Sequence, residues 1–140
     1  MFFKLPLGWL SGMRVKYLDD EKCLVNIKYR WINQNPFKSM FWAAQGMAAE
    51  MSTGVLVMKK IQDSGKKVSM LVTNQKGNFT KKATGKIRFE CHDGSLVKSA
   101  IEKSASTGEG QIIVMKSNGY NSEGVSVSSF EFEWSLKAKD

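Results

Sequence analysis

The stretch Met40–Lys59 reads MFWAAQGMAAEMSTGVLVMK and is the longest apolar run of the chain. Before its closing lysine it has one ionisable side chain, Glu50, no proline and only two glycines. A segment this rich in Met and Ala predicts a helix that is buried on nearly all sides. A carboxylate in such surroundings needs a partner, a proton or a cavity, because an unpaired buried charge is costly. We therefore expect an enclosed Glu50 beside a space that admits a ligand.

The residues on either side predict where this helix begins and ends. Ser39 is placed to act as the N-cap of a helix that begins at Met40. Asp63-Ser64-Gly65 follows two lysines and predicts the end of the helix. The small residues between positions 43 and 49 leave little bulk over two turns, which allows a sheet or a second helix to approach the helix closely. The sequence thus predicts a central helix that is wrapped by strands.

The remaining segments alternate apolar and polar residues with the period of a β-strand. We expect strands at residues 14–18, 22–31, 66–74, 83–91, 111–116 and 125–136, with turns at 19–21, 75–78 and 118–121. Residues 2–12 form an amphipathic lead-in, and residues 95–106 form a short helix with Leu96, Ala100 and Ile101 on one side, or a loop. The apolar phase slips near Ser128-Ser129, which predicts a β-bulge. Strands that pair antiparallel around one long helix predict an α+β fold.

Length and composition limit the classes of protein. With 140 residues, 42% of them hydrophobic, the chain is expected to form one domain over residues 1–140. The longest apolar run contains Gln45 and Glu50, so we expect no membrane span, and the lead-in is too short and broken for a signal peptide. We therefore expect this chain to be a cytoplasmic protein. Cys23 and Cys91 are expected to be buried thiols, and with His92 as the sole histidine we expect no metal and no cofactor.

The net charge of +8 comes from basic residues that are scattered along the chain. Two explanations stay open, a solvated lysine surface and attraction of an anionic ligand such as the phosphate-bearing carrier coenzyme A. Proteins that read nucleic acids usually concentrate arginine in one stripe. We therefore expect no nucleic-acid partner, and a basic adaptor for nucleic acid ranks last among the functions considered.

Residues 35–50, NPFKSMFWAAQGMAAE, carry a resemblance to a known family. They resemble the helix-start segment of hot-dog fold thioesterases of the phenylacetate-degradation type, which reads approximately Asn-x-x-Gly-Thr-x-His-Gly-Gly-Ala and continues to an acidic residue in the helix. The order of strands and helix is similar over nearly the whole chain, in a branch with an N-terminal extension like residues 1–18. The resemblance implies a hot-dog fold, an antiparallel sheet wrapped around one long central helix.

The resemblance also implies an acyl-CoA or acyl-carrier thioesterase. Glu50 matches the helix carboxylate that acts as general base on water or as nucleophile. Backbone N–H groups near Trp42 and Ala43 match the donors that polarise the thioester carbonyl, and Asn35 matches a polar residue that orients water or substrate. The expected substrate-binding residues are Phe41 and Met47 for the acyl group and Lys81, Lys82 and Arg88 for coenzyme A. The implied assembly is a homodimer or a dimer of dimers with the acyl chain between subunits.

Two departures from the family pattern keep alternatives open. Phe41-Trp42-Ala43 stands where the family has His-Gly-Gly, and Lys38 stands at the loop glycine. The alternative function is a catalytically silent hot-dog module that binds an acyl or other apolar ligand. For Glu50 the structural alternative is a carboxylate satisfied by a neighbouring lysine, arginine or backbone group.

Overall fold

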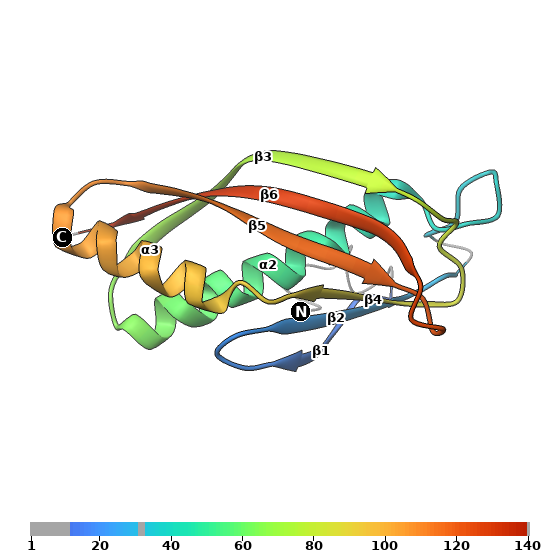
Figure 1. Ribbon diagram of the computed structural model, residues 1–140, viewed down its shortest axis with the longest axis horizontal. Helices are drawn as coiled ribbons and strands as arrows, with labels where there is room; N and C mark the ends of the chain where they lie inside the picture. The colour runs from blue at the N-terminus through green and yellow to red at the C-terminus, as the bar shows by residue number, and fades with distance from the viewer. Residues whose placement is uncertain (1–11, 31–32, 140) are drawn as a thin grey trace.

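The computed structural model describes residues 12–30 and 33–139 (Figure 1). Its elements in chain order are β1 (Arg14–Leu18), β2 (Cys23–Lys28), α2 (Trp42–Ser64), β3 (Val68–Phe79), β4 (Lys86–Cys91), α3 (Gly94–Thr107), β5 (Gln111–Tyr120) and β6 (Ser126–Ala138). Nearly all of the expected lead-in over residues 2–12 lies outside the described residues.

The six strands form one sheet in the order β1-β2-β4-β5-β6-β3, and each neighbouring pair is antiparallel. The sheet curves over α2, and α3 lies beside the C-terminal part of that helix (Figure 1). β1 and β3 are the two edge strands. The predicted α+β architecture, a sheet wrapped around one long helix, is therefore confirmed.

Alternating side chains of the sheet form the core against α2. Fully buried residues include Val25 and Ile27 of β2, Phe89 of β4, Met115 of β5 and Phe132 of β6. These are the inward positions that a period of two predicts, because successive side chains of a strand point to opposite faces.

The two cysteines lie directly opposite each other on β2 and β4, and both are free and buried, as predicted. Burial raises the pKa of Cys23 to about 12 and also raises the pKa of Cys91. Both thiols therefore stay protonated at neutral pH, and a protonated thiol is a poor nucleophile.

The start of α2 differs from the prediction, and its end agrees. The helix begins at Trp42 with Phe41 as N-cap and has no side-chain cap, so the assignment of Ser39 as the N-cap is wrong. The Ser39 hydroxyl instead donates to Asn35 Oδ1 at 3.2 Å within the preceding loop. At the other end Gly65 takes φ 67°, and its N–H donates to the Gln62 carbonyl, which confirms the predicted stop.

Two strands run through segments that the sequence predicts as turns. β3 continues through Gly77 to Phe79, and β5 continues through Gly119 to Tyr120. Each glycine lies against an aromatic ring: a Cβ at position 77 would approach Phe130 to 2.8 Å, and one at position 119 would approach Phe89 to 2.5 Å. These glycines make room for core rings, and they do not mark chain reversals.

Residues 94–107 form a helix, α3, which decides between the two predicted forms of this segment. Val97, Ala100 and Ile101 are buried, whereas Leu96 is exposed, so its predicted inward position is wrong. The face defined by positions 97, 100, 101 and 104 packs inward, and position 96 falls at its edge.

The predicted bulge in β6 is confirmed near Val127, because Gly119 pairs with Ser128 and Tyr120 pairs with Ser126.

Candidate functional site

The loop before α2 is folded by two asparagine side chains. Asn35 Oδ1 accepts hydrogen bonds from the backbone N–H of Phe37 at 2.9 Å and of Ser39 at 3.2 Å. Asn33 ties the loop to the end of β2, since its Nδ2 donates to the Lys28 carbonyl at 2.8 Å. The Nδ2 group of Asn35 makes no hydrogen bond to any described residue, so it remains available as a donor.

Lys38 has φ 59°, the left-handed conformation that glycine adopts most easily. This is the loop position at which the resembled family carries glycine. A residue with a Cβ adopts this conformation at a cost of about 1 kcal/mol, so the loop holds Lys38 in a conformation that glycine would adopt more easily.

The first two backbone N–H groups of α2 are unused. Those of Ala44 and Gln45 donate to the Phe41 carbonyl, while those of Trp42 and Ala43 have no acceptor among residues 12–30 and 33–139. Unpaired N–H groups at the start of a long helix coincide with the positive end of its dipole. The two amides are suited to bind an oxygen that carries negative charge.

A pocket of about 480 Å³ opens at this end of the helix. Five of the residues singled out from the sequence line it, namely Asn35, Phe41, Trp42, Lys81 and Lys82, together with Pro36, Phe37, Ser39, Met40, Gln45, Phe79 and Ala83. Trp42 is 60% exposed and Phe37 is 72% exposed at its rim. Exposed aromatic side chains around a concave site indicate an apolar ligand.

Gln45 is a buried polar residue of this pocket that was not among the predicted site residues. Its side chain is 4% exposed, and its Nε2 donates to the Met40 carbonyl at 3.2 Å. Its Oε1 is buried and has no hydrogen-bond partner in the part of the chain that the structure describes. A buried acceptor of this kind needs a donor from water or ligand. The signal was available, since Gln45 follows Trp42 by three positions and so lies on the same side of the helix.

Glu50 is exposed in the single chain, so the expectation of an enclosed carboxylate is wrong for one subunit. Gly46 and Gly54, one turn away on either side, face the rings of Phe130 and Trp134. No described residue forms an ion pair with Glu50. Desolvation by the surrounding atoms nevertheless raises the pKa of Glu50 above its ordinary value. Its carboxylate is unpaired, partly desolvated and open to an incoming group.

Within one chain Glu50 is remote from the pocket. It lies eight residues after Trp42, about 12 Å along the helix axis, and about 140° around the helix from Gln45. Met47 packs against the core and does not line the pocket. Arg88 lies on β4, where it pairs with Glu90 and stacks over the Tyr120 ring. The structure thus brings together some of the sequence-predicted residues and leaves Met47, Glu50 and Arg88 elsewhere.

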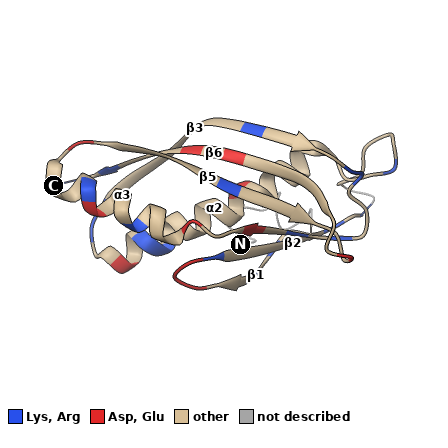
Figure 2. Ribbon diagram, in the orientation of Figure 1, with Lys and Arg blue, Asp and Glu red and all other residues tan. Residues whose placement is uncertain are grey.

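The basic residues do not form one stripe. Figure 2 shows them on loops, helices and strands. Lys81 and Lys82 lie at the pocket, and Lys82 Nζ donates to the Phe37 carbonyl at 3.4 Å. In the part of the chain that the structure describes, no three His, Cys, Asp or Glu side chains are grouped to hold a metal ion. None of its helices combines the length and the apolar character that crossing a membrane requires.

Comparison with known proteins gives one family and many similar folds. The family described as a domain of unknown function, DUF4442, matches residues 1–136. No curated protein matches the chain.

Solved structures resemble this chain over nearly its full length. A protein of unknown function from Pseudomonas aeruginosa, called a probable thioesterase, is 21% identical with a TM-score of 0.86, over 99% of this chain and 91% of that one. A thioesterase family protein from Silicibacter pomeroyi is 11% identical with a TM-score of 0.73, over 99% and 93%. A variant of a thioesterase from Staphylococcus aureus is 13% identical with a TM-score of 0.71, over 94% and 98%. These likenesses show the predicted hot-dog fold.

Proposed function

The chain belongs to the DUF4442 family, and we propose that it is a thioesterase that hydrolyses an acyl-CoA or acyl-carrier thioester. One observation carries the proposal. The two unused amides of Trp42 and Ala43 lie at the start of α2, at the pocket rimmed by exposed aromatic residues. Such donors stabilise the oxyanion that develops when a nucleophile adds to a thioester carbonyl.

The reaction needs one base and one set of donors. Glu50 takes a proton from water, and the resulting hydroxide adds to the thioester carbon, whose oxygen becomes negative at the amides of Trp42 and Ala43. The C–S bond then breaks, the sulfur leaves as a thiol that regains the proton, and a carboxylic acid remains. Direct attack by the Glu50 carboxylate, followed by hydrolysis of the anhydride, uses the same groups. Lys81 and Lys82 bind the phosphates of the carrier.

A second copy of the chain is part of the proposal, because a single chain separates Glu50 from the amides by about 12 Å. If two α2 helices pack antiparallel about a two-fold axis near Gly46, the partner subunit's Glu50 lies beside Trp42. Residue 46 is the midpoint of positions 42 and 50, so this axis brings Trp42 of each chain to the level of the partner's Glu50. Two equivalent sites then form at the interface, each with amides from one chain and a carboxylate from the other.

The Staphylococcus aureus relative supports the assignment of Asn35 and Glu50. Its solved variants carry alanine in place of a glutamine and of a glutamate that lie fifteen positions apart. Asn35 and Glu50 are separated by the same fifteen positions. An amide side chain and a carboxylate at this spacing are the pair that we assign to orient and to activate the nucleophile.

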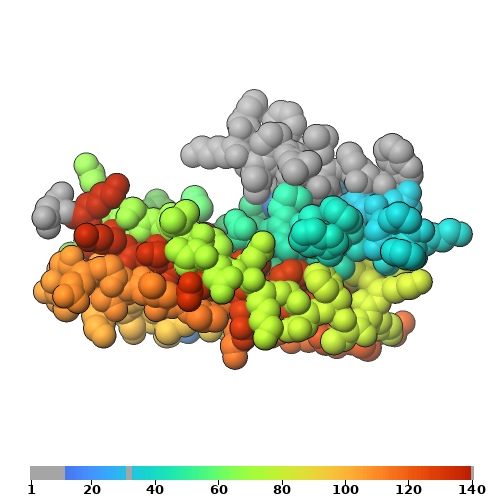
Figure 3. All heavy atoms as spheres, turned by 90° about the horizontal axis from the view of Figure 1, so that it is seen from above, coloured from blue at the N-terminus to red at the C-terminus, as the bar shows by residue number. Residues whose placement is uncertain are grey.

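The surface around β3 supports the homodimer. β3 is an edge strand, and Figure 3 shows that it and α2 reach the same face of the molecule. Met51 of α2 and Met70 and Val72 of β3 are only partly buried there. An open edge strand beside apolar side chains is a surface that a second chain completes.

A charge on the inward side of β3 is expected to break this dimer. Met70→Lys places an ammonium group among the partly buried apolar residues, whereas Leu71→Lys changes the neighbouring side chain on the outward face, which is 65% exposed. In light scattering we expect a dimer for the parent and for Leu71→Lys and a monomer for Met70→Lys, with thioesterase activity lost in step. A parent protein that is monomeric at micromolar concentration contradicts the shared site.

The pH dependence of hydrolysis follows from the raised pKa of Glu50. Only the ionised carboxylate accepts a proton, so kcat/KM rises tenfold per pH unit below the raised pKa and is constant above it. The midpoint of this limb is expected above the ordinary glutamate value of about 4.3. A kcat/KM that is flat from pH 4 to pH 8 contradicts Glu50 as the base.

The second candidate function is a silent module that binds an apolar ligand. The bulk of Trp42 beside the free amides favours it, because an exposed indole at the helix start narrows the space for a thioester. This function predicts lipid that co-purifies with the protein, seen by mass spectrometry of denatured samples, and no thiol release from any acyl-CoA. Release of thiol from an acyl-CoA would contradict the silent module and support the thioesterase.

A further inference from the structure

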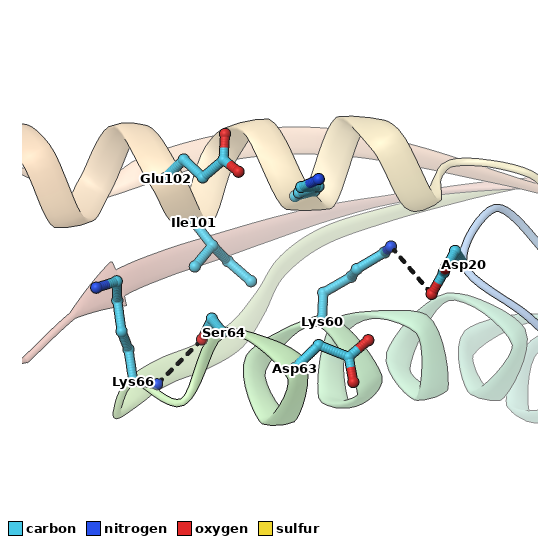
Figure 4. A pocket seen from close by; sticks show the side chains of 8 residues that line it. Asp20, Lys60, Asp63, Ser64, Lys66, Ile101 and Glu102 are labelled. Atoms are coloured by element: carbon cyan, nitrogen blue, oxygen red, sulfur yellow. Dashed lines mark hydrogen bonds and ion pairs between the residues drawn. The ribbon is translucent and has the colours of Figure 1, made fainter.

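A second cavity, of about 420 Å³, lies between the C-terminal part of α2 and α3 (Figure 4). It is separated from the first pocket by most of the length of α2, since Lys60 follows Gln45 by about 22 Å along the axis. Lysines from three segments line it, Lys60 of α2, Lys66 of the following loop and Lys98 of α3, and Ile101 supplies an apolar wall.

Lys60 is the unusual member of this group. Its side chain is only 8% exposed, and its Nζ lies 3.8 Å from Asp20 Oδ1, an ion pair without a hydrogen bond. No hydrogen bond from its ammonium to any described residue is present, although the group carries three donors. Figure 4 shows the Lys60 side chain extending from α2 into the space below α3. A buried ammonium in this state needs acceptors, because its lost hydration is not replaced by the protein.

The nearest carboxylates are already neutralised by another lysine. Lys59 Nζ donates to Asp20 at 3.0 Å and to Asp63 at 2.7 Å. The hydrogen bond from Lys59 also lowers the pKa of Asp20, so this carboxylate stays ionised and paired. Among the described residues, Lys66 and Lys98 have no carboxylate within salt-bridge distance, and Glu102 has no basic group within that distance. The lining thus holds three lysines and three carboxylates, and with Lys59, which pairs with Asp20 and Asp63, the cluster carries four lysines against three carboxylates.

We propose that this cavity is a binding site for a phosphate group. Phosphate oxygens supply the acceptors that the Lys60 ammonium lacks, and Lys66 and Lys98 balance the remaining negative charge at the mouth. The group comes either from inorganic phosphate or from a phosphate monoester whose organic part lies on Ile101. This site is independent of the thioester chemistry, because none of its residues belongs to the pocket at the start of α2.

Calorimetric titration of the full chain with inorganic phosphate and, separately, with glycerol phosphate tests the proposal. We expect saturable binding of at least one of them, and tighter binding of glycerol phosphate if the monoester is the ligand. Lys60→Met keeps the buried stem and removes the donors, so it should weaken binding by about tenfold or more, the loss of one charged hydrogen bond. Lys103→Ala removes the same charge from α3 outside the cavity and should change affinity less than about twofold.

Lys98→Ala provides a second variant on an exposed side chain that the fold does not need, and it should also weaken binding. Absence of saturable binding by both probes at millimolar concentration overturns the proposal. Equal weakening by Lys60→Met and Lys103→Ala also overturns it, because that pattern reports general surface charge. Thioester hydrolysis should be unchanged in Lys60→Met, so failure here is distinguishable from failure of the proposed enzyme activity.

Discussion

Glu50→Gln is expected to lower kcat/KM for thioester hydrolysis by about 10³-fold, the contribution that a positioned general base makes. The amide has nearly the same shape as the carboxylate but cannot accept a proton from water. A continuous assay of free thiol, with parent and variant at equal concentration, measures the loss. Glu123→Gln is the matched control, since Glu123 lies in the exposed turn between β5 and β6, outside the pocket at α2, and should keep full activity.

The Glu50→Gln variant should be at least as stable as the parent at neutral pH. Desolvation raises the pKa of Glu50 in the folded chain, so ionisation opposes folding. The stability that the protonated form provides is fully present below the unfolded pKa and is lost as the pH rises through the raised folded pKa. Glutamine does not ionise, so Glu50→Gln escapes this loss. The catalytic role of Glu50 is contradicted if Glu50→Gln keeps its activity. It is also contradicted if Glu50→Gln is inactive only because it no longer folds, which would be seen as loss of the melting transition.

Phe132→Ala is expected to reduce the free energy of unfolding by about 3–5 kcal/mol, the range for deleting a buried aromatic side chain. Phe132 is completely buried on β6, beneath the helix that carries Glu50, and its ring stacks on Phe130 with 5.9 Å between centroids. The surrounding strands belong to one continuous sheet, which limits how far the cavity can collapse. Urea denaturation followed by circular dichroism gives the difference, at one fixed protein concentration because the proposed dimer would make stability depend on concentration.

Ile112→Ala is the control for this loss. Ile112 lies on β5 with 65% of its side chain exposed, so its truncation should change the free energy of unfolding by no more than about 0.5 kcal/mol. A loss below about 1 kcal/mol in Phe132→Ala would show that the packing between β6 and α2 does not hold the fold together.

The fold was largely predictable because α2 is a long apolar run without proline and because the apolar residues of the strands recur with a period of 2. The slip near Ser128 also predicted a real bulge. The strand lengths were not predictable at Gly77 and Gly119, because the same glycine signal marks a turn or the space for an aromatic ring. Which one applies depends on Phe130 and Phe89, residues that are distant in sequence.

The candidate site was predictable in part. Asn35 and Trp42 do share a pocket with Lys81 and Lys82, which follow β3 in the chain, far from the helix start in sequence. The exposure of Glu50 was not predictable, because composition describes the helix itself and not where the sheet ends at the open edge of β3. The role of Gln45 was not predictable, because short polar side chains in helices usually bond to the backbone, and only its Nε2 does so.

Release of free thiol by the purified parent protein, over acyl-CoAs of increasing chain length at pH 8, is the decisive measurement for a thioesterase site at the start of α2. We predict turnover of at least one acyl-CoA that saturates with substrate and disappears in Glu50→Gln. Absence of turnover across the whole series, from a protein that is folded and dimeric, would contradict a thioesterase site at the start of α2.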